Sequence, residues 1–133
     1  MQYDVDFLVI GTGIAGLTFA LKVAELGHVA IVTKKEAAET STNYAQGGIA
    51  SVFGQYDSFE LHVRDTLESG NGLCKPDVVD MVIKDGPVRI QELIDWGVAF
   101  SRDHAGKLEL DLGLEGGHSQ KRIVHAGGMA ESS

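Results

Sequence analysis

The stretch Phe7-Leu8-Val9-Ile10-Gly11-Thr12-Gly13-Ile14-Ala15-Gly16 decides how this chain folds. Its first four residues form a continuous apolar run, which is typical of a parallel strand buried on both faces. Glycines follow in the spacing GxGxxG, and a helical pattern comes directly after them. A strand that turns through such glycines into a helix predicts a phosphate-binding βαβ unit.

Each glycine of this motif has its own physical reason. Gly11 permits the tight turn out of the strand, Gly13 lets a ligand's pyrophosphate approach backbone that carries no Cβ, and Gly16 lets helix and strand pack closely. A dinucleotide would then place its phosphates at the positive end of the helix dipole. The alternative is a glycine-rich turn that binds nothing.

An amphipathic helix and a second strand follow the motif. Apolar residues recur there at helical spacing (Leu17, Ala20, Leu21 and Ala24). Gly27 is placed to end the helix in a left-handed conformation, and the apolar run 29–32 predicts the second strand. The predicted fold class is α/β: a Rossmann-like domain with an incomplete parallel sheet, plus helices and a small β-hairpin.

Composition excludes several classes of partner. The 133 residues carry 11 Lys+Arg against 19 Asp+Glu, a formal net charge of -8, which argues against nucleic acid and anionic membranes because both attract clustered positive charge. Cys74 is the single cysteine, so an internal disulfide is impossible and a reducing compartment fits. The start of the chain lacks the basic region of a signal peptide, so we expect a cytoplasmic protein.

The length predicts one domain, but it also limits what the chain can hold. A doubly wound sheet that binds a whole dinucleotide usually needs several more strands than this sequence offers. We therefore expect the front part of a larger protein.

The region after the second strand departs from a plain NAD-binding pattern. Thr33-Lys34-Lys35 stands where most such folds have an acidic residue for the ribose. Lys34 either meets a phosphate or ribose or is a solvated loop residue. The segment from Glu36 to Asp57 shows no helical or alternating period, so we expect a loop that either lines a flat polar ligand or covers the surface.

Three helices are predicted next. Asp57-Ser58 caps the first, and 70–72 breaks it. Pro76 begins the second, and Gly86-Pro87 separates it from a third, which Gly97 ends. The inward-facing residues of the third helix are expected to be Val88, Ile90, Leu93 and Ile94.

Several single residues in this region allow two interpretations. Trp96 is expected to be a core anchor, with flavin stacking as the alternative. His62 and Asp65 lie one helical turn apart, but two ligands without a third do not make a metal site, so we expect an exposed or hydrogen-bonded pair and no metal.

The last third combines a hairpin with a polar cluster. Residues 98–100 and 107–110 are predicted strands, joined by a turn at 103–106. The segment 115–125 then holds Glu115, two histidines, Lys121 and Arg122 near two glycines. These residues either bind a small dicarboxylate or amino acid, because Arg forms forked bonds to carboxylates, or form a charged loop.

Six blocks of this sequence, taken in order, resemble the flavoproteins of the fumarate reductase and succinate dehydrogenase family. The blocks are 11–17, 33–34, 44–50, 57–67, 93–98 and 115–119. The resemblance implies an FAD-binding domain of which residues 1–133 are the N-terminal part, without the capping domain and the C-terminal helical domain. We expect such a part to be inactive alone.

Two positions distinguish between members of this family. Ser41 stands where the succinate and fumarate enzymes carry the histidine that bonds covalently to FAD, which implies a noncovalent flavin. Glu115 replaces an apolar residue, and a carboxylate there suits a substrate that differs from succinate by an ammonium group. The implied reaction is hydride transfer from L-aspartate to FAD, giving iminosuccinate, with oxygen or fumarate as acceptor and quinolinate synthase as the next enzyme of NAD biosynthesis.

The resemblance also assigns roles by position. The glycine turn would lie on the FAD pyrophosphate, Lys34 near the adenosine end, and Glu115 would orient L-aspartate. The residues implied for FAD are Gly11, Thr12, Gly13, Ile14, Ala15, Gly16, Lys34, Ser41, Thr42, Asn43, Tyr44, Ala45, Gln46, Gly47 and Gly48.

Two departures from the family pattern stand out. Leu114 replaces the family's arginine before Glu115, and the segment 127–133 replaces its Asp-x-Thr-Gly block. The alternatives are a soluble fumarate reductase or succinate dehydrogenase flavoprotein, and a non-catalytic nucleotide-binding fragment.

Overall fold

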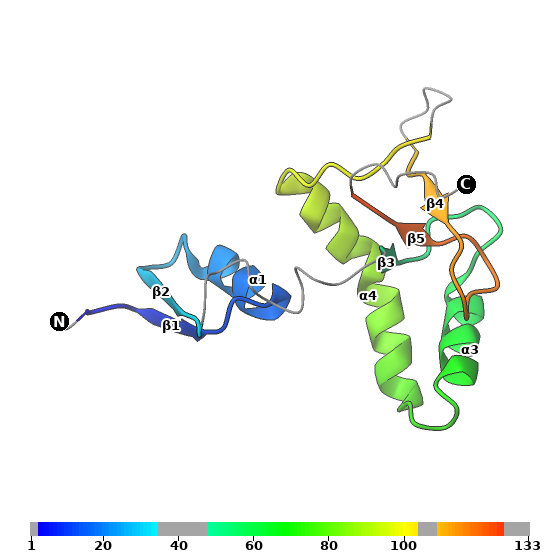
Figure 1. Ribbon diagram of the computed structural model, residues 1–133, viewed down its shortest axis with the longest axis horizontal. Helices are drawn as coiled ribbons and strands as arrows, with labels where there is room; N and C mark the ends of the chain where they lie inside the picture. The colour runs from blue at the N-terminus through cyan, green and yellow to red at the C-terminus, as the bar shows by residue number, and fades with distance from the viewer. Residues whose placement is uncertain (1–2, 35–47, 104–108, 127–133) are drawn as a thin grey trace. The chain divides into compact units, whose positions relative to one another are not determined.

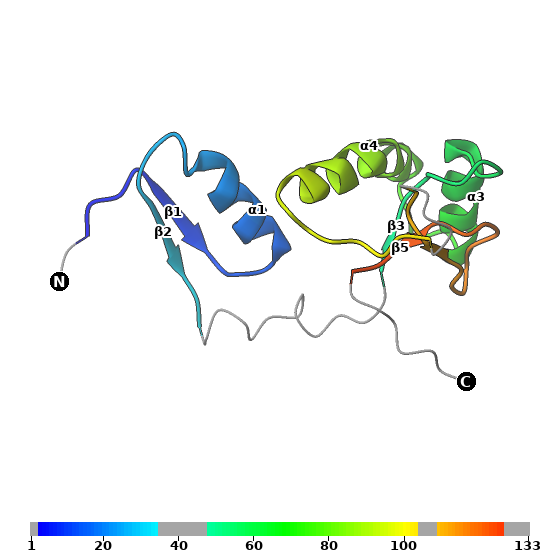
Figure 2. The ribbon, with the colours of Figure 1, turned by 90° about the horizontal axis from the view of Figure 1, so that it is seen from above.

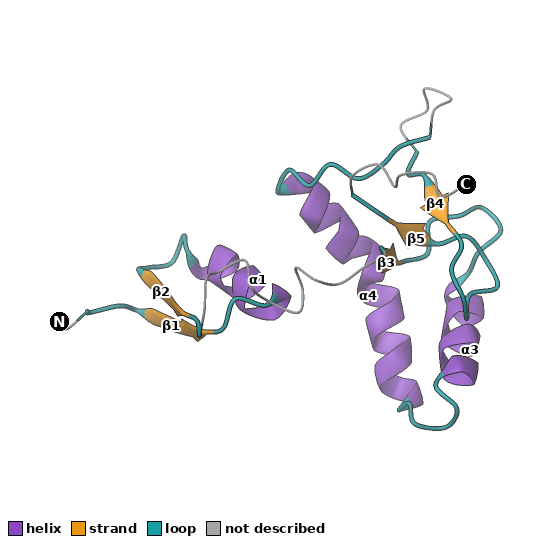
Figure 3. Cartoon of the chain, viewed as in Figure 1, coloured by secondary structure: helices purple, strands orange, loops and turns teal. Residues whose placement is uncertain are grey.

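The computed structural model describes residues 3–34, 48–103 and 109–126. The chain divides into two compact units, Met1–Gln46 and Gly47–Ser133. Both units mix helices and strands, as Figure 3 shows. Within the described ranges, no helix has the length and apolar character needed to cross a membrane.

The first unit is the predicted βαβ arrangement. Strand β1 (Phe7–Ile10), helix α1 (Ile14–Val23) and strand β2 (Val29–Val32) follow one another. The two strands are parallel, with Phe7 opposite Val29 and Ile10 opposite Val32. Figures 1 and 2 show them side by side, with α1 running back beside them. The carboxyl ends of both strands therefore lie at the same edge of the sheet as the start of α1.

The predicted role of Gly27 is wrong. Helix α1 ends at Val23, its C-cap Ala24 is right-handed with φ -60°, and Gly27 lies outside the positive-φ region. A Cβ at Gly27 would instead lie 2.6 Å from Oδ2 of Asp6, which accepts a 2.8 Å hydrogen bond from the backbone N–H of His28. This glycine makes room for a side chain that fixes the start of β2.

The second unit combines two helices with a small antiparallel sheet. Its elements are β3 (Ile49–Ala50), α3 (Phe59–Ser69), α4 (Pro76–Asp95), β4 (Leu112–Gly113) and β5 (Ile123–Val124). The sheet order is β3-β5-β4. Strand β3 lies where the sequence predicts only a loop, since two residues are too few to show a period. Ile90, Phe100 and Val124 form the buried core of this unit.

The start of α3 agrees with the sequence. Ser58 is the N-cap, and its Oγ accepts a 3.2 Å hydrogen bond from the N–H of Leu61. The helix ends at Ser69, followed by Asn71 and Gly72 with φ of 46° and 85°. The predicted break at 70–72 is confirmed.

The predicted separation at Gly86-Pro87 is wrong. Helix α4 runs without interruption for 20 residues with Pro87 inside it, as Figure 3 shows. Proline removes one helical hydrogen bond, but Ile83 and Ile90 are buried on the same face on either side of it. Continuous burial of that face outweighs the local cost. Val88, expected to face inward, is 57% exposed.

The chain after α4 differs from the prediction in detail. Gly97 follows the helix with φ 96°, as expected, but Trp96 is 41% exposed, so it is not a buried core anchor. Arg102 bridges Leu110 in antiparallel pairing, whereas Phe100 bridges Ala126. The hairpin is thus centred on 102 and 110, and residues 104–108, with the predicted turn and His104, lie outside the described residues.

Candidate functional site

The glycine turn of the first unit has the geometry that its sequence predicts. Gly11 has φ 103°, in the left-handed region that favours glycine, and its N–H donates to the carbonyl oxygen of Val32 at 2.8 Å. A Cβ at Gly16 would meet the carbonyl oxygen of Gly11 and lie 3.2 Å from Cγ1 of Val9. The roles predicted for these two glycines, the tight turn and the close packing, are confirmed.

Helix α1 begins directly after a glycine. Gly13 is the N-cap, with φ -70° and ψ 171°, and no side chain within the described part of the chain caps the helix there. Its first turn contains no acidic residue, and Ile14 and Ala15 are exposed. Backbone N–H groups at a helix start, next to a glycine without Cβ, fit the pyrophosphate of a dinucleotide.

The charges of the first unit favour an anion at the same end. Oγ1 of the buried Thr12 lies 3.3 Å from Oγ1 of Thr33, which joins the turn after β1 to the residues after β2. Lys34 follows, exposed, at this carboxyl edge of the sheet. The described acidic residues of this unit (Asp4, Asp6 and Glu25) lie at the opposite end, before β1 or after α1.

Most of the predicted flavin-lining residues lie outside the described part of the chain. They are Ser41, Thr42, Asn43, Tyr44, Ala45, Gln46 and Gly47. Gly48 is described, and a Cβ there would meet the carbonyl oxygen of Val124 and lie 2.6 Å from Cγ2 of Ile123. Contact with β5 therefore requires a glycine at this position whether or not a flavin is bound.

The turn that carries Glu115 is fastened to α3. The N–H of His118 donates to the carbonyl oxygen of Glu115 at 3.3 Å, and Gly117 has φ 81°. Both the N–H and the Oγ of Ser119 donate to Oδ2 of Asp65, at 2.8 and 2.6 Å. Glu115 is exposed. A rigid turn therefore presents its carboxylate to solvent.

Arg122 lies at the centre of a buried ion network. Its side chain is 0% exposed. Its Nε and one terminal nitrogen donate to the two oxygens of Asp57 at 2.8 and 2.6 Å, and the other terminal nitrogen donates to Oδ2 of Asp65 at 2.8 Å. Because this guanidinium is buried and paired with two carboxylates, the interpretation of Arg122 as a ligand for a dicarboxylate is wrong.

The network also corrects the expectation for His62 and Asp65. Each is 5% exposed, and the carboxylate of Asp65 bonds to Arg122 and Ser119 rather than to His62. The described residues contain no group of three or more His, Cys, Asp or Glu placed to hold a metal ion. Sequence spacing along α3 could not reveal partners 54 and 57 residues away.

Burial and hydrogen bonding set the protonation states of the network. Burial opposes ionisation of Asp65, but hydrogen bonds from Ser119 and Arg122 prevail and hold its pKa well below the usual range. Burial likewise opposes the charge of Arg122, and its bonds to Asp57 and Asp65 raise its pKa. Burial lowers the pKa of His62, with Arg122 and His118 adding to the effect. At neutral pH Asp65 and Arg122 are therefore charged, and His62 is neutral.

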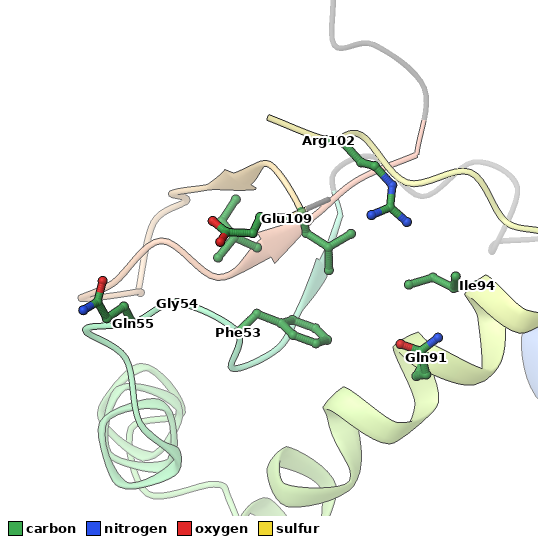
Figure 4. Close-up of a pocket in the computed structure, with 9 residues that line it drawn as sticks. Phe53, Gly54, Gln55, Gln91, Ile94, Arg102 and Glu109 are labelled. Atoms are coloured by element: carbon green, nitrogen blue, oxygen red, sulfur yellow. The ribbon is translucent and has the colours of Figure 1, made fainter. Parts of the chain in front are cut away.

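A separate pocket of about 370 Å³ lies in the second unit, between α4 and a wall formed by Phe53, Arg102, Glu109, Leu110 and Leu112. Figure 4 shows Phe53 within it and Arg102 pointing toward Gln91 and Ile94 of α4. Glu115 and His118 are not among its lining residues. The pocket is therefore distinct from the turn predicted to bind substrate.

The βαβ unit, whose glycine turn leads from β1 into α1, defines a dinucleotide-binding domain of the Rossmann-like class. Comparison with known proteins narrows this class. The family model described as "FAD binding domain" matches residues 6–132. The chain belongs to this family, and the predicted α/β fold and the prediction of FAD as cofactor are confirmed.

Two curated relatives carry the name L-aspartate oxidase. The chain is 53% identical over 124 residues to "L-aspartate oxidase 2-b, chloroplastic" of Nicotiana tabacum, covering 93% of this chain and 19% of that protein. It is 45% identical over 130 residues to L-aspartate oxidase of Pseudomonas aeruginosa, covering 94% and 24%. The chain thus spans about a fifth to a quarter of these relatives. Because the tobacco protein is described as chloroplastic, a cytoplasmic location stays a prediction.

Solved structures agree with the resemblance found in the sequence. The FrdA chain of a mutant E. coli quinol fumarate reductase is 33% identical with a TM-score of 0.81, and the match covers 93% of this chain and 22% of that one. Mycobacterium smegmatis Sdh1 is 31% identical with a TM-score of 0.82, covering 94% and 21%. The similarity to the fumarate reductase and succinate dehydrogenase flavoproteins is confirmed.

Proposed function

We propose that this chain is the N-terminal part of the FAD-binding domain of an enzyme that oxidises L-aspartate to iminosuccinate. The observation that carries the proposal is the turn from the left-handed Gly11 through the N-cap Gly13 into α1, which suits the diphosphate of FAD. The names of the curated relatives support L-aspartate as the substrate. When bound, FAD supplies the hydride acceptor.

Residues of the first unit would bind the nucleotide part of FAD. Thr12, Gly13, Ile14 and Ala15 would contact the pyrophosphate through their backbone, and Lys34 would lie near the adenosine end. Residues 41–48 would line the flavin. Ser41 in place of histidine supports a noncovalent flavin.

Glu115 would orient the substrate. An exposed carboxylate on a turn held by Asp65 suits the ammonium group of L-aspartate, because a fixed charge needs no reorganisation when the substrate binds. Leu114, 56% exposed, cannot act as the carboxylate ligand that the family's arginine supplies. Oxygen or fumarate would reoxidise the flavin, and quinolinate synthase would take the product in NAD biosynthesis.

A second candidate is a soluble fumarate reductase or succinate dehydrogenase flavoprotein, which the similarity to FrdA and Sdh1 supports. Glu115 separates the two candidates. If the carboxylate pairs with the ammonium group, Glu115→Gln should weaken the binding of L-aspartate about tenfold to a hundredfold relative to the binding of succinate. In an enzyme that acts on succinate or fumarate, the same substitution should leave the ratio of the two binding affinities unchanged.

The test uses the full-length protein that contains this chain. Absorption spectra before and after acid precipitation should show a flavin that stays in solution, and L-aspartate should bleach it without oxygen. Glu68→Gln, at an exposed position of α3, is the matched control for Glu115→Gln. A colourless protein that FAD cannot reconstitute would exclude the proposed function.

A further inference from the structure

His118 is a residue of the second unit to which the proposed function gives no role. Its Nδ1 lies 3.3 Å from a terminal nitrogen of Arg122. A guanidinium can donate hydrogen bonds but cannot accept them, so Nδ1 must be the acceptor. A neutral His118 in this contact therefore carries its proton on Nε2.

The surroundings of His118 keep this arrangement in place. The donor, Arg122, is itself fixed by Asp57 and Asp65. The ring of the buried His62 lies edge-on to that of His118, with centroids 5.6 Å apart. Among described residues, two buried side-chain atoms have no hydrogen-bond partner: Ser51 Oγ and His62 Nδ1. Nε2 of the half-buried His118 is not one of them, so it is not a buried atom without a partner.

Glu115 and His118 lie on one turn, closed by the hydrogen bond between their backbone groups. Hydrogen bonds to Asp65 and Ser69 of α3 hold the neighbouring residues, Ser119 and Gly117. The turn thus combines a carboxylate acceptor with an N–H donor. This pair is complementary to the ammonium and carboxylate groups of an amino acid.

We propose that His118 is a further substrate-binding residue that donates its Nε2–H to a carboxylate of the substrate, and that Arg122 is the positioning residue that keeps the proton on Nε2. The inference rests on the proposed function, because it places the substrate at the Glu115 turn. The two residues then bind different parts of the substrate: Glu115 binds the ammonium group, and His118 binds a carboxylate. Their substitutions should have different effects on L-aspartate and on succinate, which lacks the ammonium group.

The first test addresses the proton and needs no turnover. Long-range ¹H–¹⁵N correlation spectra of the labelled protein at neutral pH should show the His118 ring with an unprotonated Nδ1 and a proton on Nε2. Arg122→Lys, which retains a donor of different shape, should alter the His118 signals more than those of the exposed His28. A proton on Nδ1 of His118 in the unsubstituted protein would overturn the role of Arg122.

The second test addresses the substrate in the full-length flavoprotein. His118→Phe should raise KM for L-aspartate and the inhibition constant of succinate by the same factor, about tenfold to a hundredfold, with kcat nearly unchanged. His118→Gln, whose amide can place an N–H near the Nε2 position, should bring both constants most of the way back to their values in the unsubstituted protein. His28→Phe is the matched control and should change neither.

The outcomes separate this inference from the proposed function. If L-aspartate reduces the flavin and Glu115→Gln discriminates against it, but His118→Phe leaves both constants unchanged, the inference on His118 is wrong and the proposed function stands. Equal losses in His118→Phe and His118→Gln would also contradict the inference, since they indicate a packing role. A protein without flavin would overturn both.

Discussion

The two units of this chain place their functional groups by different means. In the first, the turn consists of the six consecutive residues from Gly11 to Gly16, and its bonds to Val32 and Thr33 span only 21 residues. In the second, Arg122 is held by Asp57 and Asp65, which are 65 and 57 residues away. A site built from neighbours leaves a spacing in the sequence, whereas a site built from distant ion pairs leaves single charged residues that look like surface charges.

Arg122→Met should have the largest effect on stability, because it removes the long-range anchor of the second unit and leaves two buried carboxylates without their partner. We expect it to lower the free energy of unfolding by about 3–5 kcal/mol at pH 7, measured by urea denaturation of the chain. Arg89→Met is the matched control: Arg89 pairs with Asp85 and Glu92 on the exposed side of α4, where water screens the charges, so its loss should be much smaller. Equal losses in the two variants would show that the Arg122 network is not a long-range anchor.

The elements that sequence predicts well are those with local causes. Strands β1 and β2, the Ser58 cap and the break at 70–72 each depend on a few adjacent residues. The same holds for Gly11 and Gly16, whose backbone demands follow from the turn itself. The glycine turn of the nucleotide-binding unit can therefore be predicted from the order of its residues alone.

The errors have non-local causes. Gly86-Pro87 signals a break, but burial of Ile83 and Ile90 keeps α4 continuous. Strand β3 exists because Ile49 and Ala50 pair with β5, more than 70 residues later. Arg122 resembles a free cation until its partners are known. In each case a contact distant in sequence decides the local structure, and no window of neighbouring residues contains it.

Gly16→Ala tests the first unit, whose turn has local causes, and should have an intermediate effect on the free energy of unfolding. A Cβ at this position meets the carbonyl oxygen of Gly11, so α1 must move away from β1. We expect a loss of about 1–3 kcal/mol in the free energy of unfolding. Gly116→Ala is the control from the other unit, because a Cβ there meets nothing within 4 Å, and it should stay within about 0.5 kcal/mol. A Gly16→Ala variant as stable as the unsubstituted chain would mean that the motif does not depend on close packing of helix and strand.

The smallest effect is expected from His62, and it should appear only as pH falls. Burial, and then the charge of Arg122, lowers the pKa of His62 in the folded chain below the value near 6.5 that the unfolded chain retains. Below about pH 6.5 the unfolded chain therefore binds more protons than the folded chain, so stability is full above that pH and declines as the pH falls.

One proton limits the slope of this decline to about 1.4 kcal/mol per pH unit. His62→Gln removes the titrating group, so the difference between the pH profiles of the two proteins isolates its share, since the other histidines are common to both. Urea denaturation at a series of pH values from 7.5 down to about 5 measures it. Parallel profiles would show that His62 takes up its proton as readily in the folded chain as in the unfolded chain. Separate profiles would show that the buried network, invisible to sequence spacing, also sets the response of the second unit to acid.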